Sequence, residues 1–282
     1  MPLMTVEELG SITPLFRHKF GKYLANTVMH ILSIDKINGL YDKYENLSGT
    51  DFTSAILRET GADYRIGGME NLSSLYGKPF ITISNHPYGG LDGIIMIDFF
   101  GHIFPGYKVL VNDLLSRIKT LENDFISVIP KGNEMTGPEP KSISGIREAF
   151  MHIRNGNPLG IFPSGAVSDF SIKDMCIRDR EWQKSMIRVI HRAKVPVLPV
   201  RFFDHNTAFF YSLGLINWRV RVLRLPREVI NKGGRQIRMG IGKPVTVEEQ
   251  AKYKSLKEYG NMLRKLVYGM QMPEKFKSRM EL

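Results

Sequence analysis

The chain has a single cysteine, Cys176, among its 282 residues. One cysteine cannot form a disulfide within the chain, and such usage fits a reducing compartment inside the cell. A long apolar run is also lacking: the best candidate, residues 93–111, contains Asp98, His102 and Lys108, whereas a membrane span requires about 20 largely apolar residues. The first residues of the sequence do not contain a basic segment followed by an apolar core, so we expect no signal peptide. We therefore expect a protein that does not cross a membrane and contacts one only at its surface.

Acidic residues are scarce in the last third of the chain. Residues 181–282 contain 21 Lys and Arg against 8 Asp and Glu, a net charge of +13, while residues 1–60 and 61–180 each carry a net charge of −1. Such a basic excess attracts anionic lipid, an acidic carrier protein or nucleic acid, or is a solvated surface without a partner.

Apolar periodicities predict helices and strands in alternation. We expect helices at residues 15–32, 52–59, 93–103, 142–156, 182–194 and 248–270, and strands at 64–67, 78–86, 107–112, 158–165, 195–203 and 236–245. Residues 218–223, WRVRVL, alternate Arg219 and Arg221 with Val220 and Val222. The order predicts an α/β fold, a central mostly parallel or mixed sheet flanked by helices. We expect an N-terminal helical cap at residues 1–60 and one structural unit at 61–282.

A histidine and an aspartate lie six positions apart in the segment ISNHPYGGLDG, residues 83–93. Pro87 disfavours helix for His86, and Gly89 and Gly90 permit a tight turn, which brings Asp92 back beside His86. The turn follows a predicted strand, the place where ligands bind in α/β sheets. An imidazole beside a carboxylate is a general-base unit.

Three other interpretations of this pair remain open from the residues alone. Asp92 is well placed to cap the next helix, where a carboxylate is favoured. His86 on its own is compatible with a structural histidine. The two side chains are also potential metal ligands, although no further His, Asp and Glu cluster lies nearby in the sequence.

The segment NHPYGGLDG resembles the first motif of the glycerolipid acyltransferase superfamily. That motif usually has four residues between His and Asp, and this chain has five. The longer Gly-Gly form resembles a branch that includes bacterial ornithine-lipid and glycine-lipid O-acyltransferases and hemolysin-type acyltransferases. Four further segments resemble this branch in the expected order: VNDLL (111–115), GIFPSGAVS (160–168), VPVLPVRF (195–202) and residues 209–234.

The chain departs from the superfamily pattern at two places. The third motif often carries a glutamate where this chain has Ser164 or Ala166, and the usual arginine of the second motif is replaced by Lys131 in FISVIPKGN. These departures concern recognition of the acceptor more than the His-Asp chemistry. Ser164 also raises a hydrolase alternative with His86 as base, but GIFPSGA is not a Gly-x-Ser-x-Gly elbow.

The resemblance implies transfer of a fatty acyl group from a thioester, on acyl-carrier protein or CoA, to the hydroxyl of a lipid-like acceptor. His86 would take the hydroxyl proton, Asp92 would orient His86, and no metal or organic cofactor is needed. The residues expected to bind substrate are Asn85, Gly89, Gly90, Asn112, Lys131, Phe162, Pro163, Ser164, Gly165 and Arg201.

The expected acceptor is an N-(3-hydroxyacyl) amino acid of glycine-lipid or ornithine-lipid synthesis. Lysophosphatidate is the alternative acceptor, and an acyl-thioester hydrolase or a non-catalytic membrane-binding protein is the alternative of another class. We expect a bacterial cytoplasmic protein, peripheral on the inner face of the cell membrane, that contacts anionic lipid and not nucleic acid.

Overall fold

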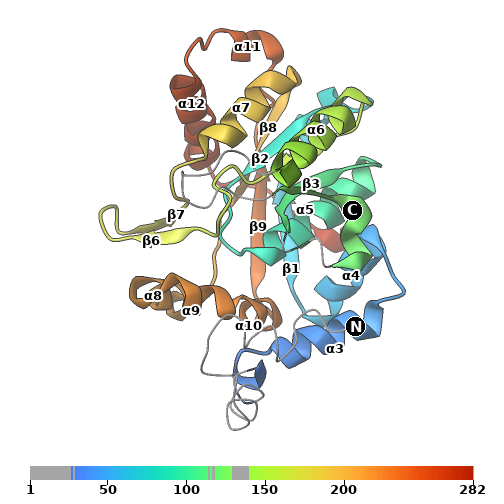
Figure 1. Ribbon diagram of the computed structural model, residues 1–282, viewed down its shortest axis with the longest axis vertical. Coiled ribbons are helices and arrows are strands. Elements are labelled where there is room, and N and C mark those ends of the chain that lie inside the picture. The colour runs from blue at the N-terminus through green and yellow to red at the C-terminus, as the bar shows by residue number, and fades with distance from the viewer. Residues whose placement is uncertain (1–26, 28, 114, 116–117, 129–139, 282) are drawn as a thin grey trace.

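A mixed β-sheet lies between layers of helices (Figure 1). The computed structural model of the chain describes residues 27, 29–113, 115, 118–128 and 140–281. The predicted α/β fold with a central mixed sheet is confirmed.

Eight strands of the described residues form the central sheet, in the order β10-β1-β9-β8-β2-β5-β3-β4. Their bounds are β1 Asp63–Gly67, β2 Ile81–Ser84, β3 Lys108–Asn112, β4 Phe125–Val128, β5 Leu159–Ile161, β8 Val197–Phe202, β9 Gln236–Ile241 and β10 Lys277–Ser278. The strands from β8 to β4 are mutually parallel, whereas β9 is antiparallel to β8. A separate hairpin of β6 (Asp169–Ser171) and β7 (Cys176–Arg178) projects to the left in Figure 1.

Helices cover both faces of the sheet. Their bounds are α3 Ile34–Tyr44, α4 Gly49–Glu59, α5 Gly90–Ile103, α6 Pro140–Arg154, α7 Lys184–Ala193, α8 Ala208–Ile216, α9 Trp218–Leu223, α10 Leu225–Ile230, α11 Val247–Ala251 and α12 Leu256–Gly269. Short 3-10 turns are η2 Met69–Leu75, η4 Lys119–Asp124 and η5 Arg279–Glu281. The helices α6, α7 and α12 pack on one face in one apolar cluster, and α4 and α5 pack on the other face in a second cluster.

The central strand β2 is buried along its whole length and directs alternate side chains to the two layers. Ile81 and Ile83 belong to the cluster with α6, α7 and α12. Thr82 shares a 2.7 Å hydrogen bond with the Tyr107 hydroxyl. Because β2 lies between the parallel strands β8 and β5, its carboxyl end opens at the middle of the sheet edge, where α/β folds bind ligands.

One prediction of local structure was wrong. The expected helix at 248–270 is two helices, because Ser255 interrupts it and caps α12 by accepting a hydrogen bond from the Lys257 N–H. The segment 218–223, in which arginine and valine alternate, is the helix α9, and its buried Arg221 side chain bonds to the Ser168 carbonyl. The helices α8 and α10 and the short strands β4, β6, β7 and β10 had no clear signal in the sequence.

The predicted helix at 15–32 lies mostly outside the described residues, although residues 27 and 29–31 are helical. Helices α3 and α4 place Tyr41, Phe52 and Ile56 in the same cluster as strand residues. The division into a cap at 1–60 and a domain at 61–282 stays a prediction. In the described part of the chain, no helix combines the length and apolar character needed to span a membrane.

Candidate active site

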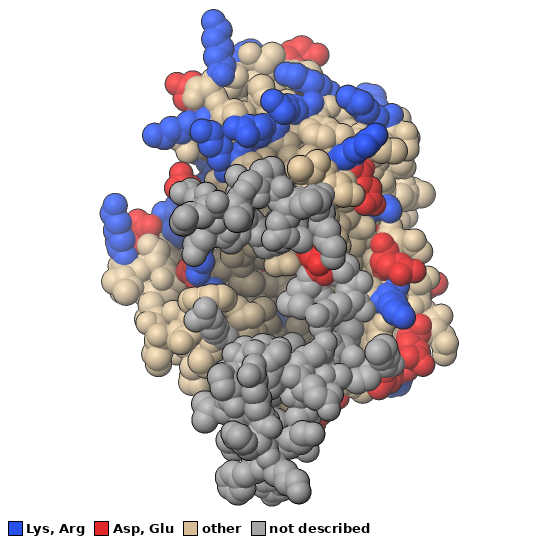
Figure 2. Space-filling view, in the orientation of Figure 1, with Lys and Arg blue, Asp and Glu red and all other residues tan. Residues whose placement is uncertain are grey.

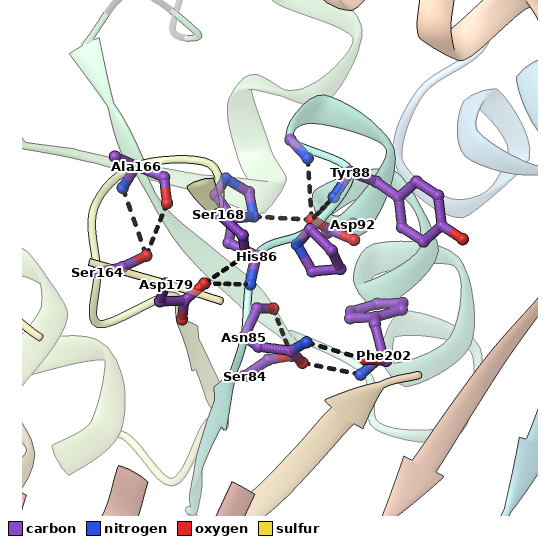
Figure 3. A network of polar contacts seen from close by, with 12 residues as sticks. Ser84, Asn85, His86, Tyr88, Asp92, Ser164, Ala166, Ser168, Asp179 and Phe202 are labelled. Atoms are coloured by element: carbon purple, nitrogen blue, oxygen red, sulfur yellow. Dashed lines mark hydrogen bonds and ion pairs between the residues drawn. The ribbon is translucent and has the colours of Figure 1, made fainter. Parts of the chain in front are cut away.

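The turn after β2 brings a histidine and an aspartate into contact. Gly89 adopts φ 77° as the N-cap of α5, and the first turn of that helix carries Asp92 back toward the end of β2. The His86 Nδ1 atom lies 2.9 Å from Asp92 Oδ2 (Figure 3). The contact has the length of an ion pair, although the ring N–H is not aligned for a linear hydrogen bond. With Nδ1 facing the carboxylate, Nε2 is the ring nitrogen left for a substrate.

The Asp92 carboxylate also caps α5. Its Oδ2 atom accepts hydrogen bonds from the backbone N–H groups of Tyr88 at 2.8 Å and Gly89 at 2.9 Å. Capping and contact with His86 are therefore two roles of one oxygen atom. Asp92 is fully buried, and this burial raises the pKa of its carboxyl, while His86 and the two N–H groups oppose the rise.

The backbone at His86 is held by a second buried carboxylate, that of Asp179. Its Oδ1 atom accepts from the His86 N–H at 3.1 Å and from the Ser168 hydroxyl at 2.6 Å (Figure 3). Its Oδ2 atom accepts from the Trp182 indole at 3.0 Å. The Ser168 N–H donates to the His86 carbonyl at 2.9 Å, so both backbone groups of His86 are fixed. Asp179 lies in the segment CIRDREW, residues 176–182, which matches no motif. Its role beside His86 was therefore not predicted from the sequence and is seen only in its contacts.

The rest of the turn is held from α8 and the loop before it. The Tyr211 hydroxyl donates to the Pro87 carbonyl at 2.8 Å, and the Asn206 amide donates to the Tyr88 carbonyl at 3.3 Å. Asn206 in turn accepts from the buried Lys232 ammonium, which also pairs with Glu228. These contacts fix the carbonyls between His86 and Asp92, and sequence motifs did not indicate them.

Asn85, predicted to bind substrate, joins the ends of β2 and β8. Its amide donates to the Phe202 carbonyl at 2.9 Å and accepts from the Phe202 N–H at 2.8 Å. Both ends of this buried amide are thus engaged with backbone. Its role toward substrate stays a prediction.

The loop after β5 lies against the histidine. The Phe162 ring is 4.2 Å from the His86 ring, centroid to centroid. Gly165 has φ 63°, and a Cβ atom there would lie 2.0 Å from the end of the Gln183 side chain, so another residue would be strained and would displace that side chain. The Pro163 carbonyl accepts from the Gln183 N–H. The buried Ser164 hydroxyl donates to the Ala166 carbonyl at 2.7 Å, which is the bond of a structural turn.

An apolar cavity of about 350 Å³ opens beside His86. Six of the predicted site residues line it: His86, Gly89, Gly90, Asn112, Phe162 and Gly165. Its far walls are apolar side chains of α3 and α4, among them Leu40, Phe52 and Ile56, together with Val229 of α10. The His86 imidazole therefore lies at the wall of a cavity whose apolar lining suits a hydrocarbon chain.

One predicted binding residue lies elsewhere, and another is not among the described residues. The Arg201 guanidinium donates to the backbone carbonyls of Tyr268 and Met270 at the end of α12, and Arg201 is not among the residues that line the cavity. Lys131 lies outside the described residues. The described residues contain no group of three or more His, Cys, Asp and Glu side chains placed to hold a metal ion.

Comparisons with known proteins agree with the motifs. The family model described as Acyltransferase matches residues 9–273. A lyso-glycine lipid O-acyltransferase from Bacteroides thetaiotaomicron is 28% identical over 256 residues, 88% of this chain and 89% of the relative. A lyso-glycine lipid O-acyltransferase from Phocaeicola vulgatus is 27% identical over 274 residues, 94% of each protein.

Among solved structures, the chain is similar to the 1-acyl-sn-glycerophosphate acyltransferase PlsC from Thermotoga maritima. The TM-score is 0.46 at 16% identity, over 88% of this chain and 87% of that chain. The resemblance to the superfamily and to its glycine-lipid branch is confirmed by the family model and the curated relatives. Because the family model spans nearly the whole sequence, the chain belongs to the acyltransferase family and is an acyltransferase.

Proposed function

We propose that the protein moves a fatty acyl group from an acyl thioester to the 3-hydroxyl of an N-(3-hydroxyacyl) amino acid, with glycine as the first choice. The observation that carries the proposal is the contact of His86 with Asp92 at the wall of an apolar cavity, in a chain of the acyltransferase family. The names of the two curated relatives support a glycine-lipid acceptor over an ornithine-lipid one.

In the proposed reaction, His86 Nε2 takes the proton of the acceptor hydroxyl as its oxygen attacks the thioester carbonyl. The new C–O bond forms, the C–S bond breaks, and the proton passes from the imidazolium to the leaving thiolate. Asp92 holds the ring through Nδ1 and stabilises the imidazolium, and no acyl-enzyme forms. The motif and the 2.9 Å contact between His86 and Asp92 support the proposed roles of both residues.

The apolar cavity is proposed to hold a fatty acyl chain. Its described lining has no Asp, Glu, Lys or Arg side chain, and apart from His86 and Asn112 it is mainly aliphatic and aromatic. Burial of a hydrocarbon chain there is favourable by about 0.8 kcal/mol for each methylene. The apolar surroundings also disfavour water as the acceptor, which argues against the hydrolase alternative.

The acceptor head group is proposed to be a carboxylate rather than a phosphate monoester. A planar arginine fork binds phosphate bidentately, and a lysine cannot copy that geometry. The second motif offers Lys131 in place of arginine, and the Arg201 guanidinium is engaged with backbone carbonyls. Lysophosphatidate is therefore the alternative acceptor.

The acyl donor is proposed to be an acyl-carrier protein, with CoA as the alternative. Figure 2 shows Lys and Arg gathered over the upper part of the molecule, where Figure 1 places α7, α11 and α12. Exposed cations there include Lys184, Arg188, Arg192, Lys194, Lys252, Lys254, Lys257 and Lys265. This basic surface suits an acidic carrier and steers its approach. We also propose that the protein works at the inner face of the cell membrane, where it would meet lipid substrates.

Direct competition tests the function. Purified enzyme receives acyl-carrier donor with N-(3-hydroxypalmitoyl)glycine, its ornithine analogue and lysophosphatidate together, and mass spectrometry identifies the products. We expect the diacylated glycine lipid to dominate. Phosphatidate as the main product would overturn the acceptor, and free fatty acid as the only product would favour the hydrolase. Turnover with acyl-CoA but not with acyl-carrier protein would contradict the donor.

Replacement of Asp179 tests whether this carboxylate positions His86. We expect Asp179→Ala to lower kcat about 10- to 100-fold with KM little changed, because small displacements of a catalytic group are costly. Asp179→Asn retains an oxygen that accepts from the His86 N–H and should recover most of the loss. Asp174→Ala, which removes an exposed carboxylate of the same hairpin, is the control. Equal losses for Ala and Asn in stably folded proteins would contradict the positioning role.

Replacement of Gly93 tests the chain site. A Cβ atom at this glycine of α5 meets no heavy atom within 4 Å, and Gly93 lines the cavity. We expect Gly93→Leu to reduce transfer of long acyl chains about tenfold or more while short chains are still transferred, since a full leucine side chain displaces several methylenes. Gly39→Leu, at an exposed glycine of α3 that is not among the cavity-lining residues, is the matched control. An unchanged chain-length profile in Gly93→Leu would argue against the cavity.

A further inference from the structure

The helices α8 and α9 turn large apolar side chains to solvent. Six of them lie within residues 209–222, with exposed fractions of Phe209 55%, Leu215 54%, Ile216 83%, Trp218 52%, Val220 46% and Val222 39%. Single exposed apolar residues are ordinary, but a contiguous group marks an interaction site. We call these six residues the α8–α9 apolar face.

The outward direction of this face is fixed by buried side chains on the same two helices. Phe210 is fully buried and Tyr211 is nearly so. Arg221 is 2% exposed, donates to the Ser168 carbonyl and pairs with Asp169. Rotating either helix to hide the apolar face would therefore expose these buried side chains and break the contacts of Arg221 with Ser168 and Asp169.

The two helices and the turns that flank them carry positive charge, and the nearest carboxylates lie on the neighbouring hairpin, where Asp169 pairs with Arg221 and Arg180, and Asp174 pairs with Arg178. Residues 205–227 contain four arginines and no aspartate or glutamate. Among them, the Arg224 guanidinium lies over the Phe209 ring at 4.5 Å, and Arg227 is exposed. The lower left of Figure 2, where Figure 1 places α8 and α9, is mostly tan, with both blue and red side chains above it. Apolar side chains with a tryptophan and bordering arginines suit the boundary between acyl chains and anionic head groups.

A second exposed apolar element lies next to this face. The strand β6 packs against α8, and the turn of the β6–β7 hairpin carries Ile172 at 68% and Met175 at 72% exposure. The hairpin turn also carries Lys173 and Asp174, and the Asp174 carboxylate pairs with Arg178. The hairpin extends the apolar surface beyond the two helices.

We propose that the α8–α9 apolar face inserts into the head-group region of an anionic lipid bilayer, in the leaflet that faces the protein. This insertion would bring the active site to its amphiphilic acceptor. The purpose given to this insertion rests on the proposed function, whereas the evidence for insertion is the exposure and charge of α8 and α9. A second copy of the chain is a poorer occupant, because a two-fold contact through this face would bring arginines of one copy against those of the other.

The helix α8, which carries part of the face, also contacts the catalytic turn from its buried side. Tyr211 of α8 bonds to the Pro87 carbonyl beside His86, and Leu225 at the start of α10 lines the apolar cavity. An acceptor lipid held at the face is therefore one helix layer from the imidazole. The apolar face is distinct from the basic surface of α7, α11 and α12 that we propose for the acyl carrier.

Vesicle binding by the full chain tests the proposal. Wild-type protein and Ile216→Ser/Val220→Ser are sedimented with vesicles of equimolar phosphatidylcholine and phosphatidylglycerol. We expect the double variant to partition at least about tenfold less, which corresponds to about 1.4 kcal/mol. Ile143→Ser/Met151→Ser is the matched control, since these residues of α6 are 54% and 55% exposed and lie away from the face. It should bind as the wild type does.

Tryptophan fluorescence gives a second, direct measurement. Trp218 is half exposed, while Trp182, the other tryptophan of the chain, is buried. We expect brominated lipids to quench Trp218 when vesicles are added. An unquenched signal, wild-type partitioning of the face variant, or a dimer that the variant dissociates would overturn the proposal.

Activity assays separate this inference from the proposed function. With a short-chain acceptor dissolved in water, the face variant should turn over as the wild type does, whereas transfer to an acceptor in vesicles should fall. Quenching of Trp218 with no acyl transfer to any acceptor would leave the face in place and reject the function. Transfer to the soluble acceptor with no vesicle binding would support the proposed function and reject the membrane-binding face.

Discussion

The Asp92 carboxylate is the constraint on which the site depends. One buried oxygen accepts two backbone N–H groups at the start of α5 and contacts His86. The turn, the helix start and the imidazole orientation are therefore set together, and none can shift without leaving buried charge or N–H groups unpaired, which is costly. Glycine at position 89 is required because its backbone has φ 77°.

Supports from distant parts of the chain converge on the same turn. Asp179 holds the backbone of His86 from the segment before α7, and Tyr211 and Asn206 hold the next two carbonyls from the region of α8. The helix α8, which supplies part of this second support, also carries part of the exposed apolar face. In this structure the element that would meet the lipid is thus the element that stabilises the catalytic turn.

The sequence predicted the features that depend on local rules. Strands β2, β5 and β8 follow from short apolar runs, and the closeness of His86 and Asp92 follows from proline and glycine conformation. It did not predict Asp179, because a buried carboxylate is recognised only by partners such as Ser168 and Trp182. Nor did alternation identify α9, where the Arg221 ion pair outweighs the local pattern.

The most direct test of the central claim is a double-mutant cycle in kcat on His86→Ala, Asp92→Asn and the two combined, with folding checked by circular dichroism. Loss of the base should lower kcat about 10²- to 10⁴-fold. Because Asp92 acts through His86, the account predicts that the double variant is no slower than His86→Ala alone. Near-normal turnover by His86→Ala, or losses that multiply in the double variant, would contradict it.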